Sequence, residues 1–221
     1  MLAINGYSGF IGSALIKALD ELGIEYKLFG RRLFCAAELE GVTKILFLSG
    51  PSDVDGFKDK VQTATSMVND YIFNIDYIKN VCRTYNRDLP EIIFGSSIAA
   101  SEINELEDEH VQYGVYKAMM ENYIKAHFEN YRIIRIPRVY GKDRKNGLMK
   151  FLRERPLESF HNKKINFIDI DDFISILIKV IYSSIQKNDY SPGGTSCLER
   201  IVRFYAHESL TPIEIKEKYN L

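Results

Sequence analysis

The sequence contains little cysteine, and its cysteines are scattered. Only Cys35, Cys82 and Cys197 occur among the 221 residues, with no CxxC pair. An odd number of distant cysteines predicts reduced thiols, as in a cytoplasmic protein, rather than a disulfide framework. The four histidines are also scattered and show no metal-ligand spacing, so we expect no metal site.

The sequence also lacks an excess of charge of either sign, and it lacks long hydrophobic runs. The formal net charge of -1 gives no basic field for nucleic acid and no polybasic signal for a membrane surface. The longest apolar stretches, such as Lys44–Leu48 and Phe173–Ile181, are too short or too interrupted to span a bilayer. The first residues resemble a strand and lack the pattern of a secretory signal. We therefore expect a cytoplasmic protein without nucleic-acid or membrane partners.

Apolar runs typical of strands alternate along the chain with segments of helical periodicity. The expected strands are 1–5, 25–29, 44–49, 91–94 and 131–136, and the expected helices are 11–22, 67–85, 114–128, 173–184 and 198–205. This alternation predicts an α/β protein with a Rossmann-type doubly wound parallel sheet and helices on both faces. In that class, ligands bind beyond the carboxyl ends of the strands.

Two parts of the chain are expected. Residues 1–141 would form a dinucleotide-binding core, and residues 142–221 a small C-terminal substrate-binding region packed on it. The segment 142–164 is rich in lysine and arginine and marks the passage between them. Its charges either solvate a surface or contact substrate phosphates.

A glycine motif, Gly6-Tyr7-Ser8-Gly9-Phe10-Ile11-Gly12, lies between the first strand and the first helix. Glycines allow a tight turn, a close approach of the backbone to a pyrophosphate, and close packing of helix on strand. The helix N-terminus offers N–H groups and a positive dipole end to phosphates. The motif therefore predicts dinucleotide binding.

The second strand ends in Phe29-Gly30-Arg31-Arg32. A carboxylate at this tip would bind the ribose 2′-hydroxyl of NAD, whereas arginines suit a 2′-phosphate. The sequence offers no carboxylate at this tip, so it favours NADP(H), with NAD(H) as the alternative. The arginines could also simply solvate a loop.

A candidate catalytic group follows the fourth expected strand. Tyr113 and Lys117 are four residues apart on a helix, which places both side chains on one face. An ammonium beside a phenol lowers the phenol pKa from about 10, which suits a general acid or base. Ser96 and Ser97 end the strand 91–94 through a glycine, at the expected active-site edge.

Together these motifs resemble the extended short-chain dehydrogenase/reductases, also called the NAD-dependent epimerase/dehydratase family. Further segments agree: Arg135-Ile136-Pro137-Arg138-Val139-Tyr140-Gly141, Phe167-Ile168-Asp169-Ile170-Asp171-Asp172, Asn74, and Gly193-Gly194-Thr195. The resemblance implies that Tyr113 moves the carbonyl proton, that Lys117 binds the nicotinamide ribose and lowers the tyrosine pKa, and that Ser97 holds the substrate oxygen. It also places Ser49, Gly50, Asn74, Ser96, Pro137 and Val139 around the cofactor.

Departures from the family narrow the function. The part that follows Tyr140 is short, Tyr116 replaces a small residue, and Ile98-Ala99 stands where sugar dehydratases carry an Asp-Glu pair. The resemblance therefore favours an NADPH-dependent reductase of a keto group on a nucleotide-linked sugar. An NAD-dependent epimerase and a non-catalytic dinucleotide-binding protein are the alternatives. Helices 67–85 and 114–128 correspond to those that pair in family dimers, so a homodimer is expected, although their apolar faces could be internal core.

Overall fold

The larger sheet has six strands with parallel neighbours throughout. Their order in the computed structural model is β2-β1-β3-β4-β5-β8. The structure describes residues 1–33, 35–50, 61–101, 108–145, 148–154, 164–183, 201–203 and 208–221. The strands are β1 (Leu2–Asn5), β2 (Tyr26–Phe29), β3 (Lys44–Phe47), β4 (Glu91–Ser97), β5 (Tyr131–Ile136) and β8 (Ile201–Arg203). β1 and most of β3, β4 and β5 are buried, as expected for a parallel sheet covered on both faces. The predicted doubly wound α/β class is confirmed.

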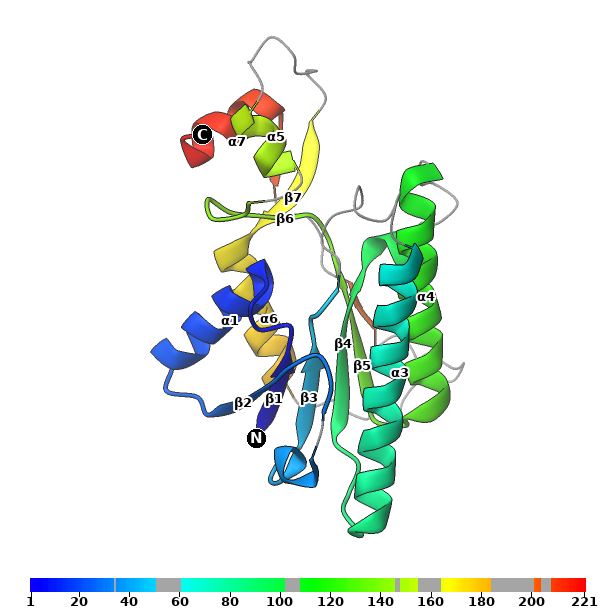
Figure 1. Cartoon of the computed structure of the whole chain (residues 1–221). Coiled ribbons are helices and arrows are strands. Elements are labelled where there is room, and N and C mark those ends of the chain that lie inside the picture. Colours follow the sequence, from blue (N-terminus) through cyan, green and yellow to red (C-terminus); the bar gives the residue numbers. More distant parts are fainter. Residues whose placement is uncertain are drawn as a thin grey trace, which may run out of the picture.

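Two pairs of helices cover the two faces of this sheet (Figure 1). On one face, α1 (Phe10–Glu21) and α6 (Ile170–Tyr182) bury Leu15, Leu19, Phe173 and Leu177 against β1 and β3. On the other face lie the long helices α3 (Val61–Thr84) and α4 (Asp108–His127). Each apolar stripe is therefore matched to one face of the sheet, which leaves the carboxyl ends of the strands for a site.

β2 forms one edge of the sheet. Between β2 and β3, the described residues form only the short 3-10 helix η1 (Ala36–Leu39). The strand order around β1 is thus 2-1-3, the flavodoxin-like version of the doubly wound pattern, and the switch point lies between β1 and β3. Lys27 of β2 donates to the carbonyl oxygens of Ala37 and Glu40 at 3.3 and 2.7 Å, which covers part of the edge.

The C-terminal part forms a second, smaller layer at the carboxyl-end side of the large sheet (Figure 1). Its sheet has the order β6-β7-β9, from β6 (Val139–Tyr140), β7 (Ile165–Asp169) and β9 (Glu208–Leu210). The helices α5 (Leu148–Glu154) and α7 (Pro212–Tyr219) pack against it through Met149, Leu152 and Ile215. The Tyr219 hydroxyl donates to Asp169 at 2.6 Å and fastens α7 to β7.

Two features after residue 141 differ from simple expectation. A helix is expected at 198–205, but residues 201–203 form β8, which pairs in parallel with β5 from Ile133 to Arg135. Hydrogen bonding at the sheet edge overrides the local helical pattern there. Since α6 also packs on the large sheet, the core takes elements from both sides of the boundary proposed at residue 141. No described helix is long and apolar enough to cross a membrane.

Candidate functional site

A cavity of about 410 Å³ lies at the carboxyl ends of β1, β2 and β3, at the switch point. Its lining comes from the glycine turn, from the end of β2, from Ser49 and from α3: Asn5, Gly6, Tyr7, Ser8, Phe29, Gly30, Arg31, Ser49, Asp70, Tyr71 and Asn74. Ligands of doubly wound proteins bind at this position. The cavity therefore brings together six of the residues predicted to bind the cofactor: Gly6, Tyr7, Ser8, Arg31, Ser49 and Asn74.

The glycine turn is built for a close backbone approach. Gly6 has a φ of +79°, and a Cβ there would lie 2.3 Å from the Ser49 nitrogen. A Cβ on Gly12 would lie 2.2 Å from the Gly6 oxygen. Gly9 precedes α1 and gives it no side-chain cap, so the first amides of this helix are left for an external acceptor. The turn therefore fits a pyrophosphate.

The other residues of the glycine motif divide into two groups. Tyr7 and Ser8 line the cavity. Phe10 and Ile11 instead turn their side chains to the core on the α1 face of the sheet. Of these two residues, only the backbone N–H groups can serve a phosphate.

A carboxylate from α3 lies beside the tip of β2, where the sequence predicted none. Asp70 of α3 accepts the Nε–H of Arg32 at 2.6 Å on Oδ1 and the Nε–H of Arg31 on Oδ2. The expectation of a tip without a carboxylate is thus wrong, because the acid comes from a helix 38 residues further along the chain. Arg31 lines the cavity and Arg32 does not, and both are partners of one buried Asp70.

Asn74 and Asn5 hold the loop after β2 in place. Buried Asn74 accepts from the Leu33 nitrogen at 2.8 Å and donates to the Arg31 oxygen at 3.0 Å. Asn5, at the end of β1, donates to the Gly30 oxygen at 2.6 Å. Asn74 lines the cavity, but its amide serves the backbone of the loop. The sequence signal for Asn5 was a polar residue at the end of an otherwise apolar strand.

Ser49 and Tyr71 extend this polar group across the switch point. The Ser49 hydroxyl donates to Asn5 Oδ1, and the Tyr71 hydroxyl lies 2.9 Å from Ser49 Oγ. Burial raises the pKa of Tyr71, so its phenol stays protonated. No sequence motif predicted that Tyr71 would belong to the site. Gly50 follows Ser49, and a Cβ there would meet Lys117 Nζ at 3.4 Å.

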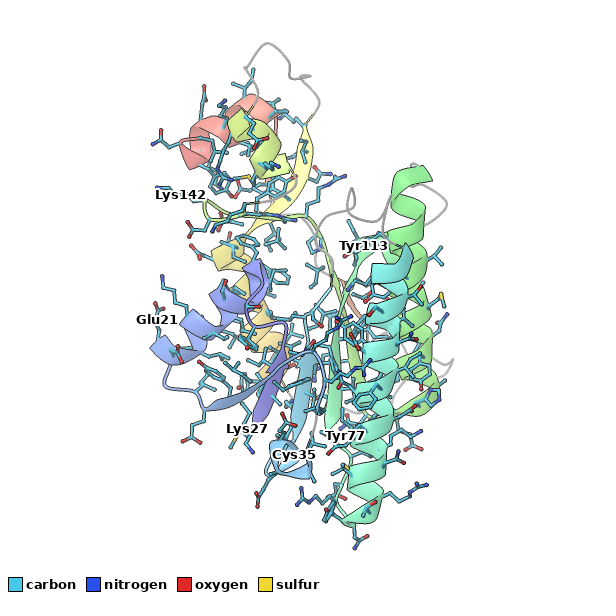
Figure 2. All side chains as sticks on the ribbon, viewed as in Figure 1. Glu21, Lys27, Cys35, Tyr77, Tyr113 and Lys142 are labelled. Atoms are coloured by element: carbon cyan, nitrogen blue, oxygen red, sulfur yellow. The ribbon has the colours of Figure 1, made fainter. Side chains whose placement is uncertain are left out.

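Ser97, Tyr113 and Lys117 form a second group at the same edge of the sheet. Ser97 ends β4, and its hydroxyl accepts from the Ala99 nitrogen at 3.3 Å at the start of η2 (Ile98–Ala100). A hydrogen bond joins Ser97 to Tyr113. Lys117 Nζ lies 5.9 Å from the Tyr113 ring centre. Tyr113 stands on the part of α4 beside the carboxyl ends of the strands (Figure 2).

The electrostatics of Tyr113 differ from expectation. Burial raises its pKa, whereas the hydrogen bond with Ser97 and the charge of Arg144 act to lower it. Lys117 was predicted to lower this pKa, but Arg144 is the cation that does so here. Arg144 reaches the site from the C-terminal part and lies 5.6 Å from the Phe10 ring centre. The sequence indicated only that Arg144 belongs to the basic segment 142–164.

Ser96 and its neighbour Ser97 make different contacts, and neither lines the cavity. Its hydroxyl donates to the buried Glu121 at 2.6 Å, and Arg135 binds both oxygens of the same carboxylate at 3.0 and 2.8 Å. The predicted cofactor role of Ser96 does not fit this arrangement, because successive strand residues point to opposite sides. Glu121 thus connects α4, which carries Tyr113 and Lys117, to β4 and β5.

Pro137 and Val139 lie outside the lining of the cavity. Pro137 follows β5, and Val139 is buried in β6, where its oxygen accepts a hydrogen bond from Arg144. Their predicted place beside the cofactor remains a prediction. The segment Gly193-Gly194-Thr195 lies outside the described residues, as do residues 51–60 and 102–107.

Comparisons with known proteins find structural likeness only. No protein-family model and no curated protein matches the chain. An NAD-dependent NDP-hexosamine 5,6-dehydratase, TunA, is 19% identical with a TM-score of 0.68, covering 98% of this chain and 78% of that one. The chain shares its fold with this enzyme over nearly its whole length. This confirms the fold that the sequence motifs implied.

Two further solved structures agree. The dTDP-4-dehydrorhamnose reductase of Bacillus anthracis str. Ames in complex with NADP is 16% identical, with a TM-score of 0.65, covering 99% of this chain and 79% of that one. The UDP-glucose 4-epimerase of Thermus thermophilus in complex with NAD is 14% identical, with a TM-score of 0.65, covering 99% and 83%. The likeness thus extends over nearly the whole chain and most of each neighbour.

Proposed function

We propose that the protein is a nicotinamide-dinucleotide-dependent oxidoreductase that reduces a keto group, with NADPH as the favoured donor. The observation that carries the proposal is the hydrogen-bonded pair Ser97 and Tyr113 beside buried Lys117, at the same sheet edge as the glycine turn. The glycine turn can bind a dinucleotide, and the group of Ser97, Tyr113 and Lys117 can donate a proton to a carbonyl oxygen.

Each residue of the site has a distinct role in the proposed reduction. The cofactor supplies a hydride. Ser97 and Tyr113 hold the carbonyl oxygen between two hydroxyl groups, and Tyr113 donates the proton to it. Because burial raises the Tyr113 pKa, the phenol keeps its proton at neutral pH and is ready to act as an acid. Lys117 binds the nicotinamide ribose.

The cofactor site is supported by the residues around the cavity. Gly6, Gly9 and Gly12 together with the start of α1 would hold the pyrophosphate. Arg31 and Arg32 would meet a 2′-phosphate with their exposed ends.

The proposed substrate class is a nucleotide-linked sugar, since the reductase and epimerase neighbours act on such compounds by their names. The test is consumption of NADPH with a panel of keto-sugar nucleotides, followed at the nicotinamide absorbance. Turnover that disappears in Tyr113→Phe supports the proposal. Absence of turnover with every member, despite cofactor binding, contradicts it.

An epimerase is the second candidate, and Asp70 favours it. A carboxylate at the tip of β2 gives the ribose hydroxyls of NAD an acceptor, and an epimerase retains its cofactor through a transient oxidation. This version predicts NAD(H) released on denaturation of the purified protein. An empty or NADP-filled preparation counts against it.

We also propose a homodimer that pairs α3 and α4 across a two-fold axis. Phe73, Val115 and Met119 on these helices are 39%, 40% and 57% exposed, which leaves apolar surface to cover. Light scattering on the purified protein tests this. A monomer at micromolar concentration would reject it. Cytoplasmic location remains a prediction from the sequence.

A further inference from the structure

Asp70 lies between the two arginines that follow β2. Each carboxylate oxygen accepts from the Nε–H of one arginine, from Arg32 to Oδ1 at 2.6 Å and from Arg31 to Oδ2. The Asp70 side chain is 8% exposed, whereas those of Arg31 and Arg32 are 63% and 44% exposed. The acid therefore lies beneath the arginines, which stay partly exposed, and Nη2 of Arg31 also donates to the Ser66 hydroxyl.

The register of α3 fixes this contact. Asp70 and Asn74 are four residues apart and lie on the same face of the helix, toward the loop after β2. Asn74 binds the loop backbone at Arg31 and Leu33, while Asp70 binds the arginine side chains. Phe73 supports Arg32 from below, with the guanidinium 5.0 Å from the ring centre. The arrangement is thus held by several independent contacts.

The carboxylate changes the charge that a cofactor meets. Two guanidinium groups and one carboxylate give a net charge of +1 rather than +2, which weakens the attraction for a 2′-phosphate dianion. An ionised carboxylate has about four acceptor positions, so Asp70 can accept a hydroxyl besides the two arginines. Asp70 also lines the cavity together with Gly6 and Gly30.

We infer that Asp70 is a specificity-determining residue that makes the site accept NADH as well as NADPH. It supplies from α3 the ribose-binding carboxylate that β2 lacks, and it offsets one of the two arginine charges. The inference rests on the proposed function only in assuming that the cavity binds the adenosine half of a nicotinamide dinucleotide.

The experiment is a binding titration of the whole chain with NADPH and with NADH, followed by nicotinamide fluorescence. In the wild-type protein the two dissociation constants are expected to lie within about ten-fold of each other, a span of about 1.4 kcal/mol. A hundred-fold preference for either cofactor overturns the inference without any variant. Binding of neither cofactor removes the inference and the proposed function together.

Asp70→Asn sharpens the test. The substitution removes the negative charge that would accept a ribose hydroxyl of NADH and that offsets one arginine charge. The ratio of NADPH affinity to NADH affinity is therefore expected to rise about ten-fold or more. Asp76→Asn is the matched control, because Asp76 lies on the same helix and instead accepts from the Tyr123 hydroxyl at 3.1 Å. An unchanged ratio in Asp70→Asn, or a fall, overturns the inference.

Two additional measurements separate the possible failures. Adenosine 2′,5′-bisphosphate and 5′-AMP, as fragments without nicotinamide, are expected to show the same change of preference in Asp70→Asn. This result is independent of catalysis. If the fragments and cofactors follow the expected pattern but no ketone is reduced, the proposed reaction fails and the role of Asp70 stands.

Discussion

The ammonium group of Lys117 donates a hydrogen bond of 2.8 Å to the carbonyl oxygen of Gly95. It is buried, and the rings of Phe94, Tyr116 and Tyr113 lie 4.9, 5.5 and 5.9 Å from its nitrogen. Burial lowers the pKa of Lys117 from 10.5 to about 8, and the charge of Glu121 only partly opposes this. A cation is therefore held next to the candidate acid at a cost in stability.

That cost predicts a pH-dependent effect of Lys117→Met. Between pH 8 and 10.5 the unfolded chain holds this proton and the folded chain does not, so wild-type stability gains from rising pH. The variant lacks this gain. The unfolding free energy of the variant minus that of the wild type is expected to be highest below pH 8. This difference is expected to fall by about 3 kcal/mol between pH 8 and pH 10.5.

Urea unfolding at pH 6.5, 8 and 9.5 measures this difference. Lys17→Met is the control, because the Lys17 side chain is 80% exposed. A difference between Lys117→Met and wild type that stays constant with pH would contradict the lowered pKa.

Tyr113→Phe is expected to remove turnover and to leave cofactor binding unchanged. The phenol oxygen is the proposed proton donor, and loss of a general acid costs about 10²–10⁴-fold in rate. Steady-state kinetics and a cofactor titration on the same preparation separate the two effects. Tyr123→Phe on the same helix is the control. If Tyr113→Phe retains more than a tenth of the activity, another group supplies the proton.

Arg144 is expected to set the upper limit of the pH range. Its positive charge lowers the pKa of Tyr113, so Arg144→Gln raises that pKa. If Tyr113 is the acid, as proposed, the alkaline decline of kcat is expected to move to higher pH. The pH profile of Lys150→Gln, an exposed lysine of α5, serves as the reference. A shift to lower pH would mean that Arg144 does not act through the phenol.

The sequence predicted those parts of the site that depend on neighbours along the chain. Gly6, Gly9 and Gly12 lie within one turn, and Tyr113 and Lys117 lie within one helical repeat, so local spacing was enough. Asp70 could not be predicted, because its contact with Arg31 spans 39 residues and depends on the register of α3 against β2. The pKa of Tyr113 likewise depends on burial and on Arg144, which only the packed structure brings together.

The same distinction holds for the fold. The strand–helix alternation predicted the sheet, since each element carries its own periodicity. β8 was missed because its three described residues are fixed by pairing with β5 rather than by a local pattern. The resemblance assigned the substrate oxygen to Ser97 and a place beside the cofactor to Ser96. The bond from Ser96 to Glu121 was not predicted, because it depends on how α4 packs against β4.

Gly12→Ala is expected to destabilise the protein and to impair dinucleotide binding. Its Cβ would lie 2.2 Å from the Gly6 oxygen and 2.7 Å from the Tyr7 Cα, so backbone must move. Such overpacking costs about 1–3 kcal/mol or more. Gly30→Ala is a matched control, since nothing lies within 4 Å of a Cβ there. Equal unfolding midpoints in urea for the two variants would argue against the tight turn.

Glu121→Gln tests the ion pair that joins Glu121 of α4 to Arg135 of β5. Burial raises the pKa of Glu121, but hydrogen bonds from Arg135 and Ser96 and the charges of Arg135 and Lys125 outweigh burial and lower it overall. The carboxylate therefore stabilises the folded state at pH values above its unfolded pKa, and this contribution is lost as pH falls through the lowered folded pKa. Removing one partner of such a pair costs about 3–5 kcal/mol at neutral pH.

The variant is expected to lose stability at pH 7 and to approach the wild-type value as pH falls below the ordinary range of a glutamate. Chemical unfolding from pH 7 down to the lowest pH at which both proteins fold measures the difference. Glu21→Gln, whose side chain is 67% exposed on α1, is the control and is expected to change stability by less than about 1 kcal/mol. A difference for Glu121→Gln that is the same at all pH values would show that its carboxylate is not held ionised by Arg135 and Lys125. The charge would then have no part in fastening α4, and with it Tyr113 and Lys117, to the strands that carry Ser97.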